Sequence, residues 1–166
     1  MNYNFRKNKL EGDQTEKKFE DLCLYYNIEI KKSSLDEDKY KHIDYYVKIK
    51  QKCFTSVDVK SIKKVNGEYN DDLYYIELTN DYGYKGWIYS KDLDIIAFEN
   101  KNEFNLYRRK DILDFIHNTD ITKYKEVKRK LYFLDTFSKC ILLPKKDIEH
   151  FKYYQLKKQY IKRNTM

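Results

Sequence analysis

The sequence has few of the residues that usually separate domains. Its 166 residues include one proline and four glycines, and it shows no Pro/Gly/Ser-rich linker and no internal repeat. A chain of this length is typical of one domain with a substantial hydrophobic core. We therefore expect a single domain over residues 1–166.

Cysteines and long apolar runs are also scarce. Cys23, Cys53 and Cys140 lie far apart without a CxxC pair, which excludes a disulfide framework and a cysteine-based zinc site and predicts reduced thiols. No apolar run approaches the roughly 20 residues of a membrane span, and the opening MNYNFRKNKL lacks the apolar segment of a signal peptide. The sequence predicts a soluble, cytoplasmic protein without a membrane partner.

Aromatic and charged residues are abundant. Eighteen Tyr and nine Phe exclude a disordered chain, which would be poor in aromatics. The formal charge is +7: thirteen Lys/Arg against four Asp/Glu give residues 121–166 a charge of +9, which leaves −2 for residues 1–120. A basic segment beside a slightly acidic body indicates a nucleic-acid partner, and a solvated basic surface is the equally weighted alternative.

Hydrophobic periodicity predicts a helix over residues 12–27. Along it, apolar residues recur at steps of three and four: Phe19, Leu22, Cys23 and Tyr26. Thr15 or Asp13 is expected to cap its start, because both side chains accept hydrogen bonds from free backbone amides.

Alternating hydrophobicity and turn residues predict the order of the remaining elements. We expect strands over 42–50, 53–62 and 72–80, a connection, a hairpin over 93–109 closed at Lys101 and Asn102, a helix over 110–118, strands over 130–137 and 139–144, and a helix from Lys145 into the tail. This order predicts an α/β or α+β fold around a mixed sheet, followed by a C-terminal β-β-α appendix.

Two aspartates interrupt strands that should fill a core. Strand alternation places Asp44 on the face opposite its apolar neighbours, which are Ile43, Tyr45, Val47 and Ile49. Asp58 and Lys60 are two residues apart on the next strand and therefore share a face. If the strands are neighbours, Asp44 reaches the same spot. Buried carboxylates that converge repel each other unless a cation neutralises them, so we predict that Asp44 and Asp58 hold Mg²⁺, with Mn²⁺ as the alternative metal.

Lys60 would then lie beside the metal. There it could orient or deprotonate a water molecule and offset charge that builds up on phosphorus. Together these groups predict metal-assisted phosphodiester hydrolysis. The structural alternative is a pair of salt bridges from the aspartates to Lys48 or Lys60 across an exposed hairpin.

The motifs HID (42–44) and SVDVK (56–60) resemble the signature of the PD-(D/E)XK nuclease superfamily, the restriction-endonuclease-like fold. The resemblance places Asp44, Asp58 and Lys60 at the signature positions, with Ile43 where the signature has proline. Many members also carry a G-x-x-x-E pattern on the first helix. GDQTE (12–16) fits this pattern and points to Glu16, with Glu20 one turn later as the second choice.

The resemblance implies an αβββαβ core over residues 1–118, and residues 119–166 form a basic extension that it does not cover. The segment YKGWIYSKDLDIIAFEN (84–100) also looks like small phage-type members of the superfamily. The implied function is a magnesium-dependent DNA endonuclease, with branched DNA or RNA as alternative substrates. A homodimer would ease cleavage of both strands of a duplex. The alternatives are a non-catalytic nucleic-acid-binding or host-interaction protein that keeps the fold, and a purely structural protein, which leaves the acids unexplained.

Further residues are candidates for the site or for its substrate. Glu77 on the third expected strand is either an additional ligand or a solvent-facing residue, and Trp87 is expected in the core rather than stacked on a base. The basic residues expected to contact phosphates, if they are more than surface charges, are Lys85, Arg108, Arg109, Lys145, Lys146, Lys157, Lys158 and Arg163.

Overall fold

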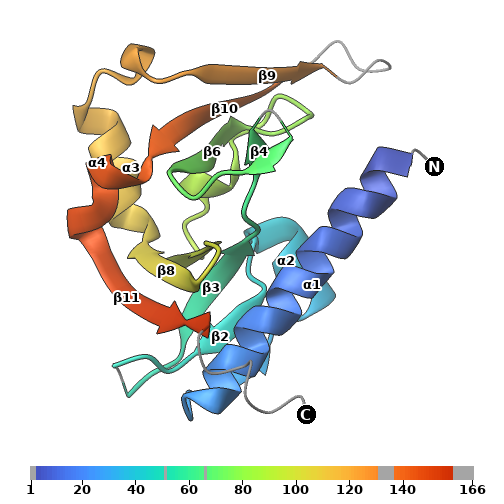
Figure 1. The fold of residues 1–166 in the computed structure, drawn as a ribbon, viewed down its shortest axis with the longest axis vertical. Helices are drawn as coiled ribbons and strands as arrows, with labels where there is room; N and C mark the ends of the chain where they lie inside the picture. The colour runs from blue at the N-terminus through green and yellow to red at the C-terminus, as the bar shows by residue number, and fades with distance from the viewer. Residues whose placement is uncertain (1–2, 51, 66, 131–136, 159–166) are drawn as a thin grey trace.

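The computed structural model describes residues 3–50, 52–65, 67–130 and 137–158 (Figure 1). These residues form a mixed α+β structure. It contains a mixed six-stranded sheet, a second sheet of three strands and a two-stranded hairpin. The expected fold class is therefore confirmed at the level of an α+β protein with a mixed sheet.

The six-stranded sheet places strands from both ends of the chain side by side. Its spatial order is β1 (Ile30–Lys32), β2 (Tyr45–Val47), β3 (Thr55–Lys60), β7 (Ile95–Glu99), β8 (Glu103–Arg108) and β11 (Lys152–Lys157). The pair β3 and β7 is parallel, and every other neighbouring pair is antiparallel. A parallel pair requires a crossover connection, and the long segment between β3 and β7 provides it.

That crossover contains the first strand of the second sheet. The three antiparallel strands of this sheet are, in spatial order, β6 (Leu73–Thr79), β10 (Phe137–Pro144) and β9 (Glu126–Lys130). The crossover also holds the small hairpin of β4 (Lys64–Val65) and β5 (Glu68–Tyr69). Gly67 closes this hairpin with φ of +86°, a conformation that glycine adopts without steric cost.

Helices join and cover the two sheets. The α-helices are α1 (Tyr3–Tyr25), α2 (Leu35–Lys41), α3 (Arg109–Asn118) and α4 (Lys145–Ile148). Three 3₁₀ turns complete the described structure: η1 (Trp87–Tyr89), η2 (Ile121–Lys123) and η3 (Glu149–Phe151). Figure 1 shows α1 running diagonally along the six-stranded sheet, with β9 and β10 at the far end of the molecule from β2 and β11.

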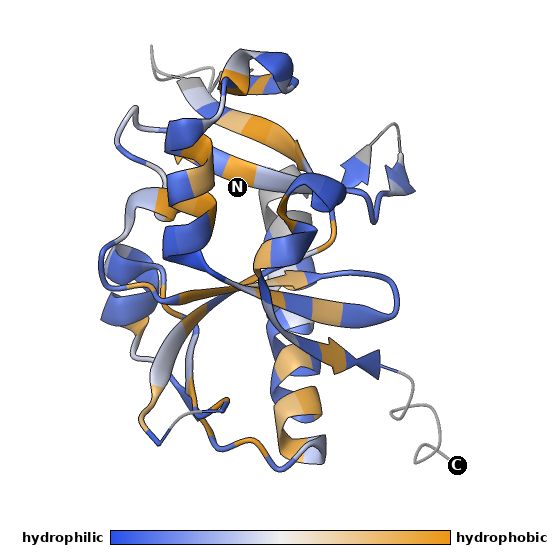
Figure 2. Ribbon diagram, turned by 90° about the vertical axis from the view of Figure 1, so that its left-hand side faces the viewer, coloured by the Kyte–Doolittle hydropathy of each residue, from blue (hydrophilic) through white to orange (hydrophobic). Residues whose placement is uncertain are grey.

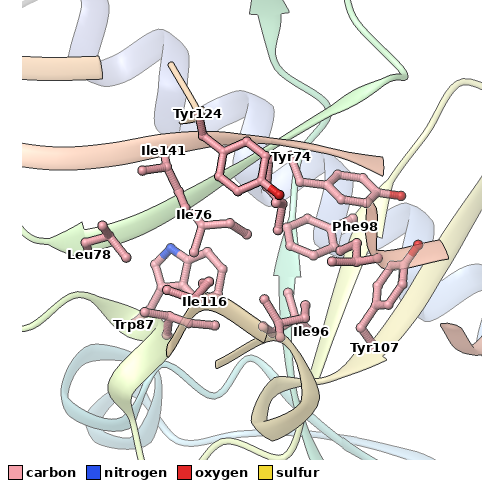
Figure 3. Close-up of a cluster of buried hydrophobic side chains, with 14 of the residues drawn as sticks. Tyr74, Ile76, Leu78, Trp87, Ile96, Phe98, Tyr107, Ile116, Tyr124 and Ile141 are labelled. Atoms are coloured by element: carbon pink, nitrogen blue, oxygen red, sulfur yellow. The ribbon is translucent and has the colours of Figure 1, made fainter. Parts of the chain in front are cut away.

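Each face of the six-stranded sheet has its own hydrophobic core. On one face, Phe19 and Leu22 of α1 pack against buried side chains of the strands, among them Val57, Val59 and Phe104. On the other face, side chains of β7 and β8 pack against α3, η1 and the second sheet, as Figure 3 shows for Ile96, Phe98, Tyr107, Trp87, Ile76 and Ile141. The side chains of β3 that alternate with Val57 and Val59 therefore point towards this second core.

Hydrophobic residues are distributed in short stretches. Figure 2 shows hydrophobic and hydrophilic residues following one another along helices and strands, the pattern expected where one side of an element is buried. Within the described part of the chain, no helix has both the length and the apolar character needed to cross a bilayer.

Several local predictions are confirmed. The first helix, the strands around Asp44 and Asp58, the hairpin of β7 and β8, and the helix over 110–118 are all present. Trp87 is a core residue with 5 % of its surface exposed. The predicted inward face of residues 43–49 is also correct, because its apolar side chains are all buried: Ile43, Tyr45, Val47 and Ile49.

The predicted start of the first helix is wrong. The helix begins at Tyr3, so Thr15 and Asp13 lie inside it and cap nothing. The Thr15 hydroxyl is instead within hydrogen-bonding distance of the Glu11 carbonyl oxygen (2.9 Å) and of the Glu99 carboxylate (3.0 Å). A buried hydroxyl needs such partners, and the Glu99 contact comes from a distant part of the chain.

Two predictions about strand arrangement are also wrong. The strand over 72–80 exists as β6, but it pairs with β10 in the second sheet rather than joining the one mixed sheet that was expected. The expected C-terminal helix ends at Ile148, and residues 152–157 form β11, which pairs with β8. Of the expected β-β-α appendix, the strand over 139–144 is present within β10, and the strand over 130–137 falls mostly outside the described residues. The final helix is replaced by β11, which covers the edge of β8.

Candidate active site

Asp44 lies immediately before β2, where it contacts the backbone of β3 on both sides of Asp58. Its amide donates to the Val57 carbonyl oxygen (2.9 Å), and its carboxylate Oδ2 accepts a hydrogen bond from the Val59 amide (2.6 Å). β2 pairs with β3 only as far as Tyr45 and Val57, so the carboxylate satisfies an amide that the β2–β3 pairing does not reach. The side chain is buried as a result.

Asp58 and Lys60 project from β3 towards the second core. Lys60 Nζ lies 2.6 Å from Asp58 Oδ2, and the ammonium is 5.0 Å from the centre of the Trp87 ring. The Asp58 side chain is 4 % exposed and that of Lys60 is 26 % exposed. Among the described residues, no donor makes a hydrogen bond of regular geometry to Asp58 Oδ2. The nearest group to this oxygen is the Lys60 ammonium, whose positive charge holds it.

The pKa values of these groups show strong mutual influence. Burial, and after it the charge of Asp58, raises the pKa of Asp44 to about 8, while Lys60 and the Val59 amide offset only part of the rise. For Lys60, burial alone would lower the pKa. The negative charges of Asp58 and Asp44 outweigh burial, so the Lys60 pKa is raised. Asp44 therefore holds its proton more strongly than an ordinary aspartate, and Lys60 keeps its positive charge more strongly than an ordinary lysine.

Glu77 reaches the same cluster from the second sheet. Burial raises its pKa, and the nearby Lys60 ammonium and a hydrogen bond from the Trp87 amide offset part of that rise. The hydrogen bond from the Trp87 amide requires the segment before η1 to lie close to β6. The two segments meet at Gly86, whose amide donates to the Leu78 carbonyl oxygen (2.9 Å). Of the two interpretations of Glu77, the structure favours a residue of the site over a solvent-facing one.

Replacing Gly86 with alanine tests this close packing. The added Cβ would meet the Glu77 carbonyl oxygen at 2.3 Å, so we expect Gly86→Ala to lower the free energy of unfolding by roughly 1–3 kcal/mol. The matched control is Gly12→Ala in the interior of α1, where a Cβ has nothing within 4 Å. There the change should raise the free energy of unfolding by about 0.5–1 kcal/mol. Urea titrations of both variants measure the difference, and equal stabilities would contradict it.

Glu16 lies at the edge of the cluster, and Glu20 lies outside it. The Glu16 charge is close enough to contribute to the raised pKa of Asp44. Its own pKa is raised by burial, although an ion pair with Lys32 (3.4 Å) offsets part of the rise. Glu20 is half-buried, pairs with Lys17 (3.0 Å) and is not among the charges that act on Asp44. Of the two glutamates considered for the first helix, Glu16 is the one that the fold brings near the aspartates.

The oxygen atoms in this cluster have the chemistry that a divalent cation needs. Asp44 and Asp58 provide two buried carboxylates, and Asp58 Oδ2 receives no directed hydrogen bond from the described residues. Mg²⁺ commonly takes one or two protein carboxylates and completes its shell with water and substrate phosphate. Over residues 3–50, 52–65, 67–130 and 137–158, no group of three or more His, Cys, Asp or Glu side chains is placed to hold a metal ion. A metal ion at this cluster would therefore have to bind through Asp44 and Asp58 alone, with water and substrate completing its shell.

The salt-bridge alternative accounts for one contact only. Asp58 pairs with Lys60, as that alternative expects, but both aspartates are buried rather than exposed on a hairpin. Lys48 pairs with Glu29 (2.6 Å) instead. Asp44 forms no ion pair within the described part of the chain, so the salt-bridge alternative does not account for this buried acid.

The structure gives some of the predicted phosphate-binding residues other contacts. Arg109 donates to the carbonyl oxygens of Leu93 (2.7 Å) and Ile88 (2.9 Å), which anchors the start of α3 to η1. Lys145 pairs with Glu103 (3.4 Å) and Lys158 with Glu99 (2.8 Å). The side chains that remain exposed are Lys85, Arg108, Lys146 and Lys157, and Arg163 lies outside the described residues.

Glu99 is a buried charged residue that the sequence patterns did not indicate. This residue ends β7, is 4 % exposed, and lies close to three donors from different elements: Thr15 (3.0 Å), Lys18 (3.0 Å) and Lys158 (2.8 Å). Burial would raise its pKa, but Lys158 and Lys18 outweigh burial and lower it. The one feature of the sequence that could have pointed to Glu99 is its position directly after the apolar run IIAF. Glu99 links α1, β7 and the end of β11.

Comparisons of the chain with protein-family models, with curated proteins and with solved structures found no match. The function proposed below therefore rests on the residues and the geometry of this chain.

Proposed function

We propose that the protein is a metal-dependent DNA endonuclease with Asp44, Asp58 and Lys60 at its centre. The observation that carries the proposal is that buried Asp44, just before β2, lies against β3, which carries Asp58 and Lys60, and that the Asp58 charge contributes to the raised pKa of Asp44. Raised pKa values caused by burial and by specific charges are concentrated at functional sites. A purely structural protein would need only an uncharged oxygen there to accept the hydrogen bond from the Val59 amide.

The strand order supports a restriction-endonuclease-like core. The helix α1 is followed by β1, by the short helix α2, by the antiparallel strands β2 and β3, and later by β7, which is parallel to β3. The first of these strands, β1, is an element that the sequence did not predict. The chain departs from the αβββαβ order at the crossover, where β6 and η1 stand in place of a long helix.

Each residue has a distinct proposed role. Asp44 and Asp58 would hold Mg²⁺ or Mn²⁺, which when bound polarises a phosphate oxygen and makes a bound water more acidic. Lys60 carries a positive charge, so it donates hydrogen bonds to the attacking water and to the scissile phosphate and offsets the charge of the transition state. Glu16 and Glu77 supply further negative charge at the edges of the cluster.

A second candidate function is nucleic-acid binding without cleavage. The observation that favours it is the Lys60 ammonium, which already pairs with Asp58 and supplies a positive charge without a metal ion. In that case the ion pair of Lys60 and Asp58 is permanent, and no metal ion binds at the candidate site.

A cleavage assay distinguishes the two functions. Duplex, branched and single-stranded DNA, and RNA of the same sequence, are incubated with the protein in Mg²⁺, in Mn²⁺ and in chelator. Cleavage that requires a metal ion supports the nuclease. Binding without cleavage of any substrate under all conditions supports the second candidate.

The basic C-terminal region gives a separate prediction about DNA binding. Lys146 and Lys157 are exposed, so neutralising both to glutamine should reduce the slope of log K against log salt by about 2, since each lysine that binds a phosphate contributes roughly one. Binding titrations between low and moderate salt measure the slope. The control is Lys17→Gln, because Lys17 already pairs with Glu20 (3.0 Å) and Asp21 (3.1 Å). An unchanged slope in the double variant would mean that these lysines are ordinary surface charges.

A further inference from the structure

A cavity begins at Lys60 and runs between the two sheets. Its volume is about 370 Å³, within the range of about 300–1,000 Å³ that is typical of small-molecule sites. Lys60 and Glu77 of the candidate site are part of its wall. The cavity is therefore continuous with the proposed reaction centre.

The wall of this cavity combines aromatic rings with polar groups. Tyr74 and Phe98 are stacked with their ring centres 4.1 Å apart, and Trp87 meets Phe98 edge to face at 6.3 Å. Figure 3 shows these three side chains in one cluster. Polar groups of the wall include Asp81 and Ser138. Flat rings together with a few hydrogen-bonding groups form the kind of surroundings that an extruded nucleobase occupies in enzymes that bind one.

Next to the cavity, a short turn holds two tyrosines in solvent. Tyr82 and Tyr84 are 64 % and 72 % exposed. The Asn80 side-chain oxygen accepts hydrogen bonds from the amides of both tyrosines, each at 3.0 Å, and the Asn80 amide donates to the Tyr84 carbonyl oxygen at 2.8 Å. The turn is therefore fixed by its own hydrogen bonds. The two rings are largely exposed and are not part of the hydrophobic core.

We propose that the preferred substrate is DNA with unpaired nucleotides next to the cleaved bond. One unpaired base enters the cavity beside Lys60, and neighbouring bases stack on Tyr82 and Tyr84. The faces of paired bases are hidden within a duplex, so rings can stack only on bases that have left it. The Lys60 ammonium at the cavity wall attracts the phosphate that joins these nucleotides. The inference rests on the proposed function, since it takes DNA as the substrate.

The test measures binding in chelator, where no metal-dependent cleavage occurs. Fluorescence anisotropy compares a blunt duplex, a fork with an unpaired arm and a single strand, all of equal length. We expect the fork and the single strand to bind at least tenfold more tightly than the duplex. Tyr82→Ala and Tyr84→Ala should each weaken that binding by roughly tenfold, in line with the usual strength of base–aromatic stacking. Tyr82→Phe and Tyr84→Phe keep the rings and should bind like wild type.

Two further readouts locate the base and control for general effects. Trp87 is the only tryptophan, so its fluorescence should change when an unpaired base enters the cavity and stay constant with blunt duplex. Tyr25→Ala is the matched control, because Tyr25 is a partly exposed tyrosine at the far end of α1. It should bind every DNA like wild type.

The possible results separate this inference from the proposed function. Equal binding of duplex and fork, or tyrosine-to-alanine variants that bind like wild type, would overturn the inference even if metal-dependent cleavage is found. If no substrate is cut but binding depends on the tyrosines, the endonuclease proposal fails and unpaired DNA remains the ligand.

Discussion

Lys60→Ala should lower the rate of DNA cleavage by roughly 10²–10⁴-fold, the usual contribution of a positioned proton-transfer or charge-stabilising group. Binding of DNA should stay within a few-fold of wild type, because the lysine acts on the reacting water and phosphate. Single-turnover cleavage and anisotropy on the same substrate measure both quantities. The control is Lys64→Ala, which removes an exposed lysine whose ammonium lies over the Tyr69 ring.

Removing the ammonium leaves Asp58 buried without its partner, which can cost about 3–5 kcal/mol of stability. Folding of Lys60→Ala is therefore checked by circular dichroism, and Lys60→Arg provides a second variant that keeps the positive charge. The arginine variant should fold like wild type and still cut more slowly, because a planar guanidinium does not reproduce the position of a compact ammonium. Cleavage at the wild-type rate in folded Lys60→Ala would show that another residue has the role assigned to Lys60.

Asp58→Asn is expected to lose both metal binding and cleavage. An amide oxygen is a weaker ligand for Mg²⁺ than a carboxylate, and the variant keeps the size of the side chain. Thermal unfolding with and without Mg²⁺ gives a readout that is independent of activity. Mg²⁺ should raise the melting temperature of wild type and leave that of Asp58→Asn unchanged, and an equal rise in both would place the metal elsewhere.

Asp44→Asn should make the protein more stable than wild type at alkaline pH, by roughly 2–5 kcal/mol at about pH 9. The pKa of Asp44 is raised to about 8 in the folded protein, from its ordinary value of 3.8. A pKa difference of one between the folded and unfolded chain corresponds to about 1.4 kcal/mol, and local relaxation reduces the full amount. The asparagine retains an oxygen that can accept the hydrogen bond from the Val59 amide, and it carries no buried charge.

The direction of the pH dependence follows from proton binding. Between about pH 4 and pH 8, the folded protein keeps a proton on Asp44 that the unfolded chain releases. The contribution of Asp44 to the free energy of unfolding therefore falls as the pH rises through this window, and it is constant above it. The difference between Asp44→Asn and wild type should grow from near zero at about pH 4 to its full value above about pH 8.

Urea titrations at several pH values measure this difference. The control is Asp13→Asn, which replaces an exposed carboxylate on α1 and should follow the wild-type profile. A constant difference between Asp44→Asn and wild type at all pH values would mean that Asp44 is ionised throughout. A more stable but inactive variant is the outcome expected where a functional site keeps a buried group that stability alone would remove.

The local pattern of the sequence was sufficient to predict the centre of the candidate site. Strand alternation placed Asp58 and Lys60 on one face and Asp44 opposite its apolar neighbours, and the structure has this arrangement. Alternation has a period of two residues and depends only on the backbone of each strand. For the same reason, the helices α1 and α3 and the hairpin of β7 and β8 could be recognised from the pattern of each segment alone.

Only the tertiary structure decided which distant groups meet these residues. Glu77 of the second sheet lies near the Lys60 charge, and Lys158 and Arg109 make contacts within the protein. The local sequence of residues 152–157 predicts part of a lysine-rich helix. The segment forms the strand β11 instead because it pairs with β8 at the edge of the sheet. Such contacts depend on pairing and burial between segments far apart in the chain. The periodicity of one segment carries no information about which distant segment it pairs with. These contacts could therefore be identified only from the tertiary structure.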